Sequence, residues 1–211
     1  LAEETGHIRR LTAWTLERTI ADHAALAARG CDIELALNLS GCMIAEPGFA
    51  EHIIDRVRDT GARLCLEITE TAVISNPEAA LSAIRRLREA GLRISIDDYG
   101  SGMSSLTYLR QIPADELKID KSFVLQLTEG GRDALLVKST VDLAHSLGLK
   151  LVAEGVETRE TLAVLELMGC DVAQGYFIAR PMPLAELVAF MAASPKAGPA
   201  PAPRRRRPNA A

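Results

Sequence analysis

Apolar and polar residues follow two different periods along this chain. Short, nearly continuous apolar runs, such as 63–68 and 149–153, are separated by longer stretches in which apolar residues recur every three or four positions, as Leu81, Ile84 and Leu87 do. The first pattern predicts buried strands of a parallel sheet, and the second predicts helices that bury one face. The two patterns alternate about six times, which is typical of a parallel sheet covered by helices.

Residue types that begin and end helices divide the chain into elements. Asn76 followed by Pro77 is suited to a helix N-terminus, as is Thr158, and Gly91 and Gly148 each follow a helical stretch. We expect helices over residues 11–28, 47–60, 77–90, 104–110, 132–147, 159–168 and 184–190. We expect strands over residues 33–39, 63–68, 92–98, 116–120, 149–153 and 171–177.

Large apolar side chains mark the predicted buried faces of two of these helices. Trp14 and Leu16 belong to the apolar stripe of 11–28, and Leu135, Leu136 and Leu143 belong to the stripe of 132–147. Because residues three or four positions apart share one face of a helix, we expect these side chains to face the core.

Two architectures contain such a sheet, an open doubly wound sheet and a barrel. No Gly-x-Gly-x-x-Gly turn is present, and polar residues follow nearly every predicted strand instead of one switch point. Both observations favour a barrel with its site on the C-terminal face. A (β/α)8 barrel takes eight units and about 250 residues, whereas about six units fill the roughly 190 residues before the tail. We therefore expect an α/β TIM-like barrel that is truncated at its N-terminus.

Composition is typical of a globular protein with a polar tail. Hydrophobic residues make up 48% and charged residues 25% of the 211 residues, which is enough for one sizeable core. We expect one domain over residues 1–193 and a disordered tail over 194–211, which is rich in proline and alanine. Arg204–Arg207 is the kind of run that attracts nucleic acid or a membrane surface. No aromatic residue lies among these arginines, so we expect a solvated tail and no nucleic-acid partner.

Sequence features that report on location point to the cytoplasm. There is no run of eighteen apolar residues and no charged-then-apolar leader, so neither a membrane span nor a signal peptide is predicted. The four cysteines lack Cys-x-x-Cys spacing, which fits a reducing compartment. The chain begins at Leu1 rather than Met, so a membrane anchor of a longer parent protein would lie upstream.

Asp97 and Asp98 are the first candidates for chemistry, because they are adjacent acids at the end of an apolar run. Two adjacent carboxylates repel each other, and either a cation or solvent relieves that repulsion. For an isolated pair, one acid capping the next helix and the other facing solvent would be the better interpretation. The other strands also end in polar residues, which favours a shared site.

Strand ends supply a set of polar residues that is almost entirely oxygen donors. Taken alone, Asn38 is equally suited to a turn, and Glu67 or Glu154 to solvent. Taken together, carboxylates and an amide without Cys or His suit Mg²⁺ or Mn²⁺ rather than zinc, and two such ions can support phosphodiester hydrolysis. The set is Asn38, Glu67, Asp97, Asp98, Lys118, Asp120, Glu154 and Gln174.

Six segments of the sequence resemble, in order, the signature segments of the EAL domain family, the cyclic di-GMP phosphodiesterases. The resemblance extends from about Ala2 to Met191. The segments are Asn38–Ser40, Leu66–Glu70, Ile96–Leu106, Leu117–Phe123, Ala153–Thr158 and Gln174–Tyr176.

The resemblance implies a variant (β/α)8 barrel that hydrolyses cyclic di-GMP to linear pGpG with two Mg²⁺ or Mn²⁺ ions. Lys118 resembles the lysine that holds or activates the attacking water, and Glu70 resembles the glutamate that tethers the glycine loop after Asp98; we assign both to the catalytic set. The residues that resemble metal ligands are Asn38, Glu67, Asp97, Asp98 and Glu154. Those that resemble the lining of the substrate and water shell are Asp120, Glu157 and Gln174.

The sequence departs from the family pattern in two places. Tyr99, Ser101 and Met103 replace the usual Phe, Thr and Tyr of the glycine loop. The Glu-Ala-Leu segment, with its metal-binding glutamate, would precede Ala2 and is absent from this chain. The alternative function is therefore an impaired EAL domain that acts as a cyclic di-GMP binding or protein-interaction module. The family resemblance also implies a homodimer and an upstream sensory or GGDEF domain in the parent protein.

Overall fold

The structure, a computed structural model, describes residues 6–73, 76–100, 106–127 and 131–193. Six strands form one sheet in chain order, and each strand pairs in parallel with the next. The strands are β1 (Leu35–Leu39), β2 (Leu64–Thr69), β3 (Arg93–Tyr99), β4 (Glu116–Ile119), β5 (Lys150–Ala153) and β6 (Val172–Ala173). This order is that of a partial TIM-type barrel, as the sequence predicted.

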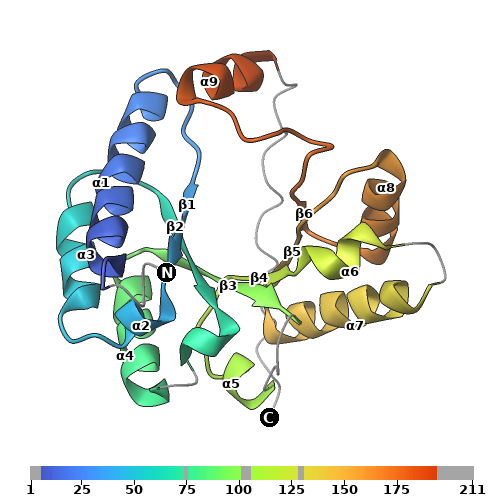
Figure 1. Ribbon diagram of the computed structural model, residues 1–211, viewed down its shortest axis with the longest axis horizontal. Coiled ribbons are helices and arrows are strands. Elements are labelled where there is room, and N and C mark those ends of the chain that lie inside the picture. Colours follow the sequence, from blue (N-terminus) through green and yellow to red (C-terminus); the bar gives the residue numbers. More distant parts are fainter. Residues whose placement is uncertain (1–5, 74–75, 101–105, 128–130, 194–211) are drawn as a thin grey trace, which may run out of the picture. The chain divides into compact units, whose positions relative to one another are not determined.

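Helices occupy the connections between the strands, because parallel neighbours need a crossover. Figure 1 shows α1, α3 and α4 beside the β1–β3 part of the sheet, and α7 and α8 beside the β4–β6 part. The helices are α1 (Ile8–Ala27), α2 (Gly41–Ile44), α3 (Phe49–Val57), the 3-10 helix η1 (Glu70–Val73), α4 (Pro77–Glu89), α5 (Leu106–Leu109), α6 (Lys121–Leu125), α7 (Arg132–Leu147), α8 (Arg159–Met168) and α9 (Leu184–Ala193).

The outer face of the sheet is apolar and forms the core with the helices. Leu37, Leu66 and Ile94 lie side by side in the strand register, and so do Leu117 and Leu151 on the next strands. Each of these side chains is buried. Because successive residues of a strand point to opposite faces, the residues between them point to the inner face of the sheet, and most of these are polar or charged. The strand periodicity therefore separates the apolar core from the polar inner face.

Capping follows the sequence prediction at two helix N-termini. The Asn76 side chain accepts a hydrogen bond from the Ala79 main-chain N at 3.4 Å, and Pro77 occupies the first turn of α4. Thr158 Oγ1 accepts from the Thr161 main-chain N at 3.1 Å at the start of α8. Side chains that bond these first amide groups offset donors that a helix leaves without a partner.

The last strand is shorter than predicted. β6 contains Val172 and Ala173 instead of residues 171–177. The chain turns directly afterwards, and the Ile178 N–H donates to the Gly175 carbonyl at 3.0 Å. This turn begins at Gly175, where a side chain would collide with the Val156 main chain. The close approach of two backbones, which the sequence pattern does not report, therefore ends the strand.

The sequence prediction for the buried faces of α1 and α7 is partly wrong. Leu16 is buried and Leu143 packs against the core, as predicted, but three other side chains are exposed. Trp14 is 64% exposed on α1, and Leu135 is 70% exposed on α7. Leu136 is also exposed. The buried residues of α7 are instead small, namely Ala134, Val137, Val141 and Ala144. Small side chains allow a helix to approach a sheet closely. The packing of α7 against the sheet, and not hydrophobicity alone, therefore determines which face of the helix is buried.

Chain contacts divide the protein into two compact units, Leu1–Pro181 and Met182–Ala211, and α9 belongs to the second. The domain boundary predicted at residue 193 stays a prediction. Among the described helices, none has the length and apolar character needed to cross a bilayer.

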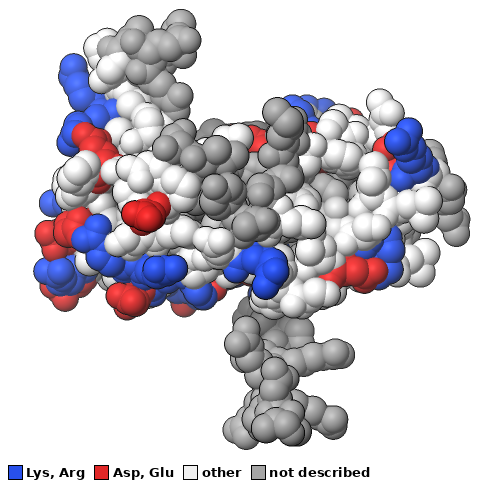
Figure 2. Space-filling model, turned by 90° about the horizontal axis from the view of Figure 1, so that it is seen from below, with Lys and Arg blue, Asp and Glu red and all other residues white. Residues whose placement is uncertain are grey.

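Charged side chains of both signs lie on the face of the protein that Figure 2 shows. Figure 2 shows Lys and Arg intermixed with Asp and Glu on the left of the view, the side on which α1, α3 and α4 lie in Figure 1. Arg56 of α3 donates to both carboxylate oxygens of Glu17 on α1, at 2.5 and 2.6 Å. Arg86 of α4 pairs with Glu51 of α3. The described residues of this surface therefore pair their charges locally instead of forming a single-sign patch.

The buried face of α7 yields a prediction about stability. Val137→Ala should lower the free energy of unfolding by about 2 kcal/mol, because it removes two buried carbon groups and leaves a small cavity. Leu135→Ala should change this free energy by less than about 0.5 kcal/mol, since the side chain faces solvent. Urea unfolding of both variants measures the difference. A larger loss for Leu135→Ala would show that α7 is rotated relative to the structure.

Candidate functional site

The C-terminal ends of the parallel strands bring the predicted polar residues to one edge of the sheet. Asn38 of β1 is opposite Glu67 of β2 in the strand register, and Thr69 of β2 is opposite Asp97 of β3. Lys118 lies near the end of β4, and Glu154 directly follows β5. The ends of five strands therefore contribute to one site, although these residues are far apart in the sequence.

Lys118 is at the centre of this site. Its ammonium Nζ lies 2.6 Å from Glu154 Oε1, 2.9 Å from Glu67 Oε1 and 3.0 Å from Asp97 Oδ1. The Lys118 residue is only 4% exposed. An ammonium has three N–H donors, and each carboxylate here lies within hydrogen-bond distance of it. The lysine thus ties together β2, β3 and the end of β5.

Electrostatics keep this lysine charged. Burial alone lowers the pKa of Lys118, but hydrogen bonds to Glu154 and Glu67 and the charges of Glu67 and Asp97 outweigh that effect and raise it. The pKa of Glu67 is raised, first by burial and further by the negative charges of Asp97 and Glu154, although the Lys118 ammonium acts in the opposite direction. Lys118 is consequently a cationic donor at neutral pH. It lacks the free electron pair that a general base needs.

Asp98 reaches the same side of β3 as Asp97 through an unusual backbone conformation. Adjacent residues in a regular strand point to opposite faces, but Asp98 has a positive φ of 56°. The pairing of β3 with β4 shifts register between Ile96 and Tyr99, and the Asp98 main-chain N–H donates to Asp97 Oδ1 at 3.1 Å. Irregularities of this kind re-aim side chains and cluster at functional sites.

The three acids Asp97, Asp98 and Glu154 fit a divalent metal ion. One carboxylate oxygen of each lies within 4.8 Å of the others. Burial raises the pKa of Asp98, and the negative charges of Asp97 and Asp120 raise it further. A divalent cation would relieve this repulsion, and an all-oxygen donor set suits Mg²⁺ or Mn²⁺.

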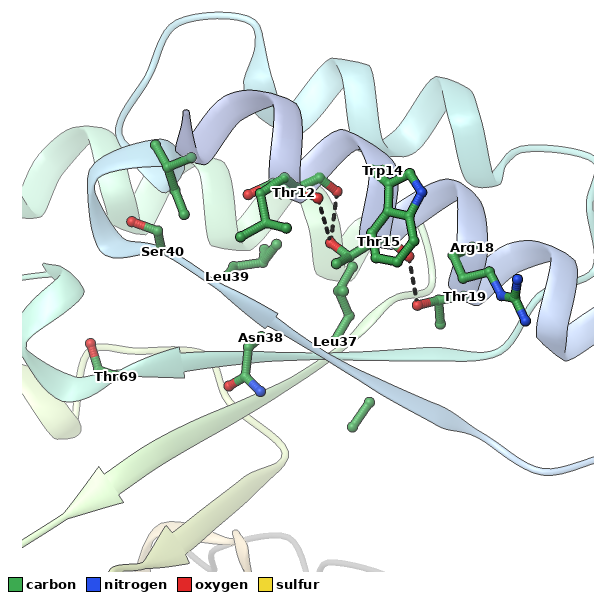
Figure 3. Close-up of a pocket in the computed structure, with 13 residues that line it drawn as sticks. Thr12, Trp14, Thr15, Arg18, Thr19, Leu37, Asn38, Leu39, Ser40 and Thr69 are labelled. Atoms are coloured by element: carbon green, nitrogen blue, oxygen red, sulfur yellow. Dashed lines mark hydrogen bonds between the residues drawn. The ribbon is translucent and has the colours of Figure 1, made fainter. Parts of the chain in front are cut away.

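Asn38 lies beside a groove at the edge of the sheet. Figure 3 shows Leu37 and Leu39 on the α1 side of β1 and Asn38 on the opposite side. The groove has a volume of about 530 Å³, and Trp14 of α1 lines it. Trp14 was predicted to face the core. The exposure of Trp14 depends on how α1 packs against β1, which the sequence pattern does not report.

The predicted substrate residues lie around the site in different settings. Asp120 Oδ1 accepts a hydrogen bond from the Ser122 main-chain N at 2.9 Å and caps α6. Hydrogen bonding by Ser122 also lowers the pKa of Asp120. Glu157 and Gln174 are both exposed. The Gln174 carbonyl accepts from the Val156 N–H at 3.0 Å, which holds the chain after β6 beside the loop after β5.

Two predictions cannot be compared with side-chain geometry. Glu70 begins η1, but its side chain lies outside the part of the chain that the structure describes. Residues 101–105 of the glycine loop also lie outside the described residues. The tether between Glu70 and this loop stays a prediction.

Comparison with known proteins agrees with this arrangement. A family model described as the EAL domain matches residues 1–181. The cyclic di-GMP phosphodiesterase NbdA of Pseudomonas aeruginosa is 38% identical over 197 residues, which is 92% of this chain and 25% of NbdA. The bifunctional diguanylate cyclase/cyclic di-GMP phosphodiesterase MucR of the same organism is 38% identical over 200 residues, 91% of this chain and 29% of MucR. The chain thus spans about a quarter of the length of these relatives.

Solved structures of related proteins are also similar to this one. The MucR phosphodiesterase in complex with c-di-GMP superposes with a TM-score of 0.82 and 37% identity, covering 88% of this chain and 83% of that one. The EAL domain of DcpA from Mycobacterium smegmatis superposes with a TM-score of 0.81 and 35% identity, covering 87% of this chain and 84% of that one. The match in sequence extends over the strands that carry the site, and we conclude that this chain belongs to the EAL domain family.

Proposed function

We propose that this chain is the catalytic domain of a cyclic di-GMP phosphodiesterase, which hydrolyses its substrate to linear pGpG. The observation that carries the proposal is the contact of Lys118 with three carboxylates, with Asp98 brought alongside by its backbone. The names of NbdA and of the MucR complex support the choice of substrate. Both proteins share more than a third of their aligned residues with this chain.

The charge balance of the site supports a metal-dependent reaction. Glu67, Asp97 and Glu154 supply three negative charges around one ammonium, and the substrate phosphate is also an anion. An excess of negative charge repels such a substrate unless cations are bound. Asp97, Asp98 and Glu154 would hold one ion, with Glu67 and Asn38 completing the set toward β1. Bound Mg²⁺ or Mn²⁺ would supply positive charge and make water more acidic.

In the hydrolysis, a water oxygen forms a bond to phosphorus and one P–O bond of the cyclic diester breaks. The attacking water gives up one proton, the oxygen that leaves takes up one, and the product is a linear dinucleotide with a terminal phosphate. Lys118 orients the attacking water and stabilises negative charge as a donor, since its raised pKa keeps it protonated. The carboxylates of Glu67 and Glu154 hold the ammonium in place. Positioning and charge stabilisation are the main contributions of a protein to phosphoryl transfer.

Residues near the rim complete the proposal for the substrate. Asp120, Glu157 and Gln174 follow β4, β5 and β6 at the same edge of the sheet, which supports contact with the substrate or its water shell. Glu70 would act indirectly by holding the glycine loop after Asp98. A homodimer, a cytoplasmic location and an upstream sensory or GGDEF domain remain predictions, and the bifunctional name of MucR supports the last of these for that relative.

The alternative proposal is a cyclic di-GMP binding module without hydrolysis. In this alternative the same carboxylates and rim residues bind the ligand, and no P–O bond breaks. Measuring pGpG formation and cyclic di-GMP binding on one sample separates the two functions.

We predict that hydrolysis requires Mg²⁺ or Mn²⁺ and that Ca²⁺ inhibits it. Ca²⁺ prefers longer bonds and more ligands, so it would displace the carboxylates from their working positions. The measurement is pGpG formation after chelation and after addition of each metal. Full activity in excess chelator would rule out a metal-dependent reaction.

We predict that Lys118→Ala lowers turnover by about 10²- to 10³-fold, the usual contribution of one positioned hydrogen-bond donor that stabilises developing charge. The metal-free variant should also be less stable, because three carboxylates lose their shared partner. Lys138→Ala is the matched control, since Lys138 forms an exposed pair with Asp142 on α7. Equal turnover of the two variants would remove Lys118 from the mechanism.

In the described sheet β1 pairs only with β2, which leads to another prediction. An added N-terminal segment whose strand ends in Glu-Ala-Leu should pair with β1 and fill the groove beside α1, so metal affinity, stability and hydrolysis should all increase. Replacing the added glutamate by glutamine should keep the gain in stability and lose the gain in activity. Equal hydrolysis by residues 1–211 and by the longer chain would contradict the proposed role of this segment.

A further inference from the structure

The junction between β4 and the short helix α6 lies between two segments that carry acids of the candidate metal site. It is hydrogen-bonded to both of them. The Asp120 N–H donates to the Tyr99 carbonyl at 3.3 Å, and the Glu154 N–H donates to the Ile119 carbonyl at 3.4 Å. Tyr99 directly follows Asp98. The chain therefore enters α6 between the backbone of one candidate ligand and the backbone of another.

On the β3 side, an aromatic ring of α6 lies against the backbone that follows Asp98. A Cβ atom at Gly100 would lie 2.8 Å from Phe123 Cε2 and 3.1 Å from Phe123 Cζ, which is closer than non-bonded carbon atoms approach each other. Gly100 also has a positive φ of 94°. Only a glycine leaves room for the ring edge at this position.

On the β5 side, α6 approaches the residue after Glu154 equally closely. A Cβ atom at Gly155 would lie 2.7 Å from Lys121 Cβ and 3.4 Å from Lys121 Cα, and Gly155 has a positive φ of 74°. Each of the two glycines is within two residues of a candidate metal ligand. The helix thus contacts both segments at their backbones, so its position limits how far either segment can move toward the other.

We propose that α6 sets the spacing of the metal site and that Phe123 is a positioning residue for Asp98. One carboxylate oxygen each of Asp97, Asp98 and Glu154 lies within 4.8 Å of the others, and one ion can bind all three only while that spacing is kept. The Phe123 ring blocks movement of the Gly100 backbone toward α6.

This positioning role depends on the conformation of the chain after β3. Asp98 has a positive φ of 56° and Gly100 one of 94°, so the chain turns sharply within three residues, and such turns keep their shape where neighbouring atoms fix them. The role rests on the proposed metal-dependent function. The packing of Phe123 against Gly100 does not.

The first test compares Phe123→Leu with Phe49→Leu. Leucine lacks the ring atoms that face Gly100, and Phe49 is a buried phenylalanine of α3 that serves as the matched control. Thermal unfolding is measured in chelator, and Mn²⁺ binding is measured by calorimetry on the folded proteins. We expect both variants to lower the midpoint temperature by about 2–4 °C. Only Phe123→Leu should weaken Mn²⁺ binding, by about 10-fold. Unchanged Mn²⁺ affinity of Phe123→Leu would overturn the positioning role.

The second test compares Gly100→Ala with Gly91→Ala. Gly91 has nearly the same φ, 91°, but no atom of the described residues lies within 4 Å of a Cβ added there. The two substitutions therefore impose similar backbone strain, and only the methyl group at Gly100 meets a ring. We expect Gly100→Ala to weaken Mn²⁺ binding about 10-fold. Gly91→Ala should lower the midpoint temperature and keep Mn²⁺ affinity within about 2-fold. Equal affinities of the two variants would contradict the proposal.

Combining Gly100→Ala with Phe123→Leu tests the contact itself. Because leucine makes room for the new methyl group, Gly100→Ala should cost at least about 3-fold less Mn²⁺ affinity in the Phe123→Leu protein than in the unaltered one. Additive losses would overturn the contact. Absence of Mn²⁺ binding by the unaltered chain would overturn the proposed metal-dependent function and the positioning role with it. The midpoint temperatures of the same four proteins would still decide whether Phe123 packs against Gly100.

Discussion

The contact between the Lys118 ammonium and three carboxylates is the interaction on which the site depends. A buried charge is costly unless it is paired, and Lys118 is paired with Glu67, Asp97 and Glu154 at 2.6–3.0 Å. Those three acids come from different strands, so their distances hold only while the sheet keeps its register. The same contacts raise the pKa of Lys118, which defines it as a donor. The protonation state of Lys118 therefore depends on the geometry of the sheet.

The sheet performs two tasks because its faces differ. Outward side chains such as Leu66 and Leu117 are buried against helices, and inward side chains carry charge. The inner face has one ion cluster around Lys118 and another in which Arg93 joins Glu34 and Glu116. Strand alternation places both clusters away from the apolar core. The hydrophobic core can thus stabilise the strands without surrounding the charged groups of the candidate site.

Local irregularity concentrates where the acids converge. Asp98 has a positive φ, and the register of β3 against β4 shifts at the same place. A regular strand would send Asp97 and Asp98 to opposite faces. The irregular backbone brings both carboxylates near Glu154, where their mutual repulsion favours a cation. The Asp98 N–H donates to Asp97 Oδ1 in this conformation, and aspartate adopts a positive φ more readily than most residues.

The sequence by itself determined the order of strands and helices and the residue types at the strand ends. Those properties depend on local periodicity and on helix caps such as Asn76 and Thr158, which act over a few residues. Tertiary structure decided that Val137 rather than Leu135 faces the core, that Trp14 lines a groove and that Asp98 turns toward Asp97. It also decided that Asp120 caps α6. Each of these depends on how closely elements distant in the sequence approach one another. The apolar periodicity of the chain reports only local structure and does not predict those distances.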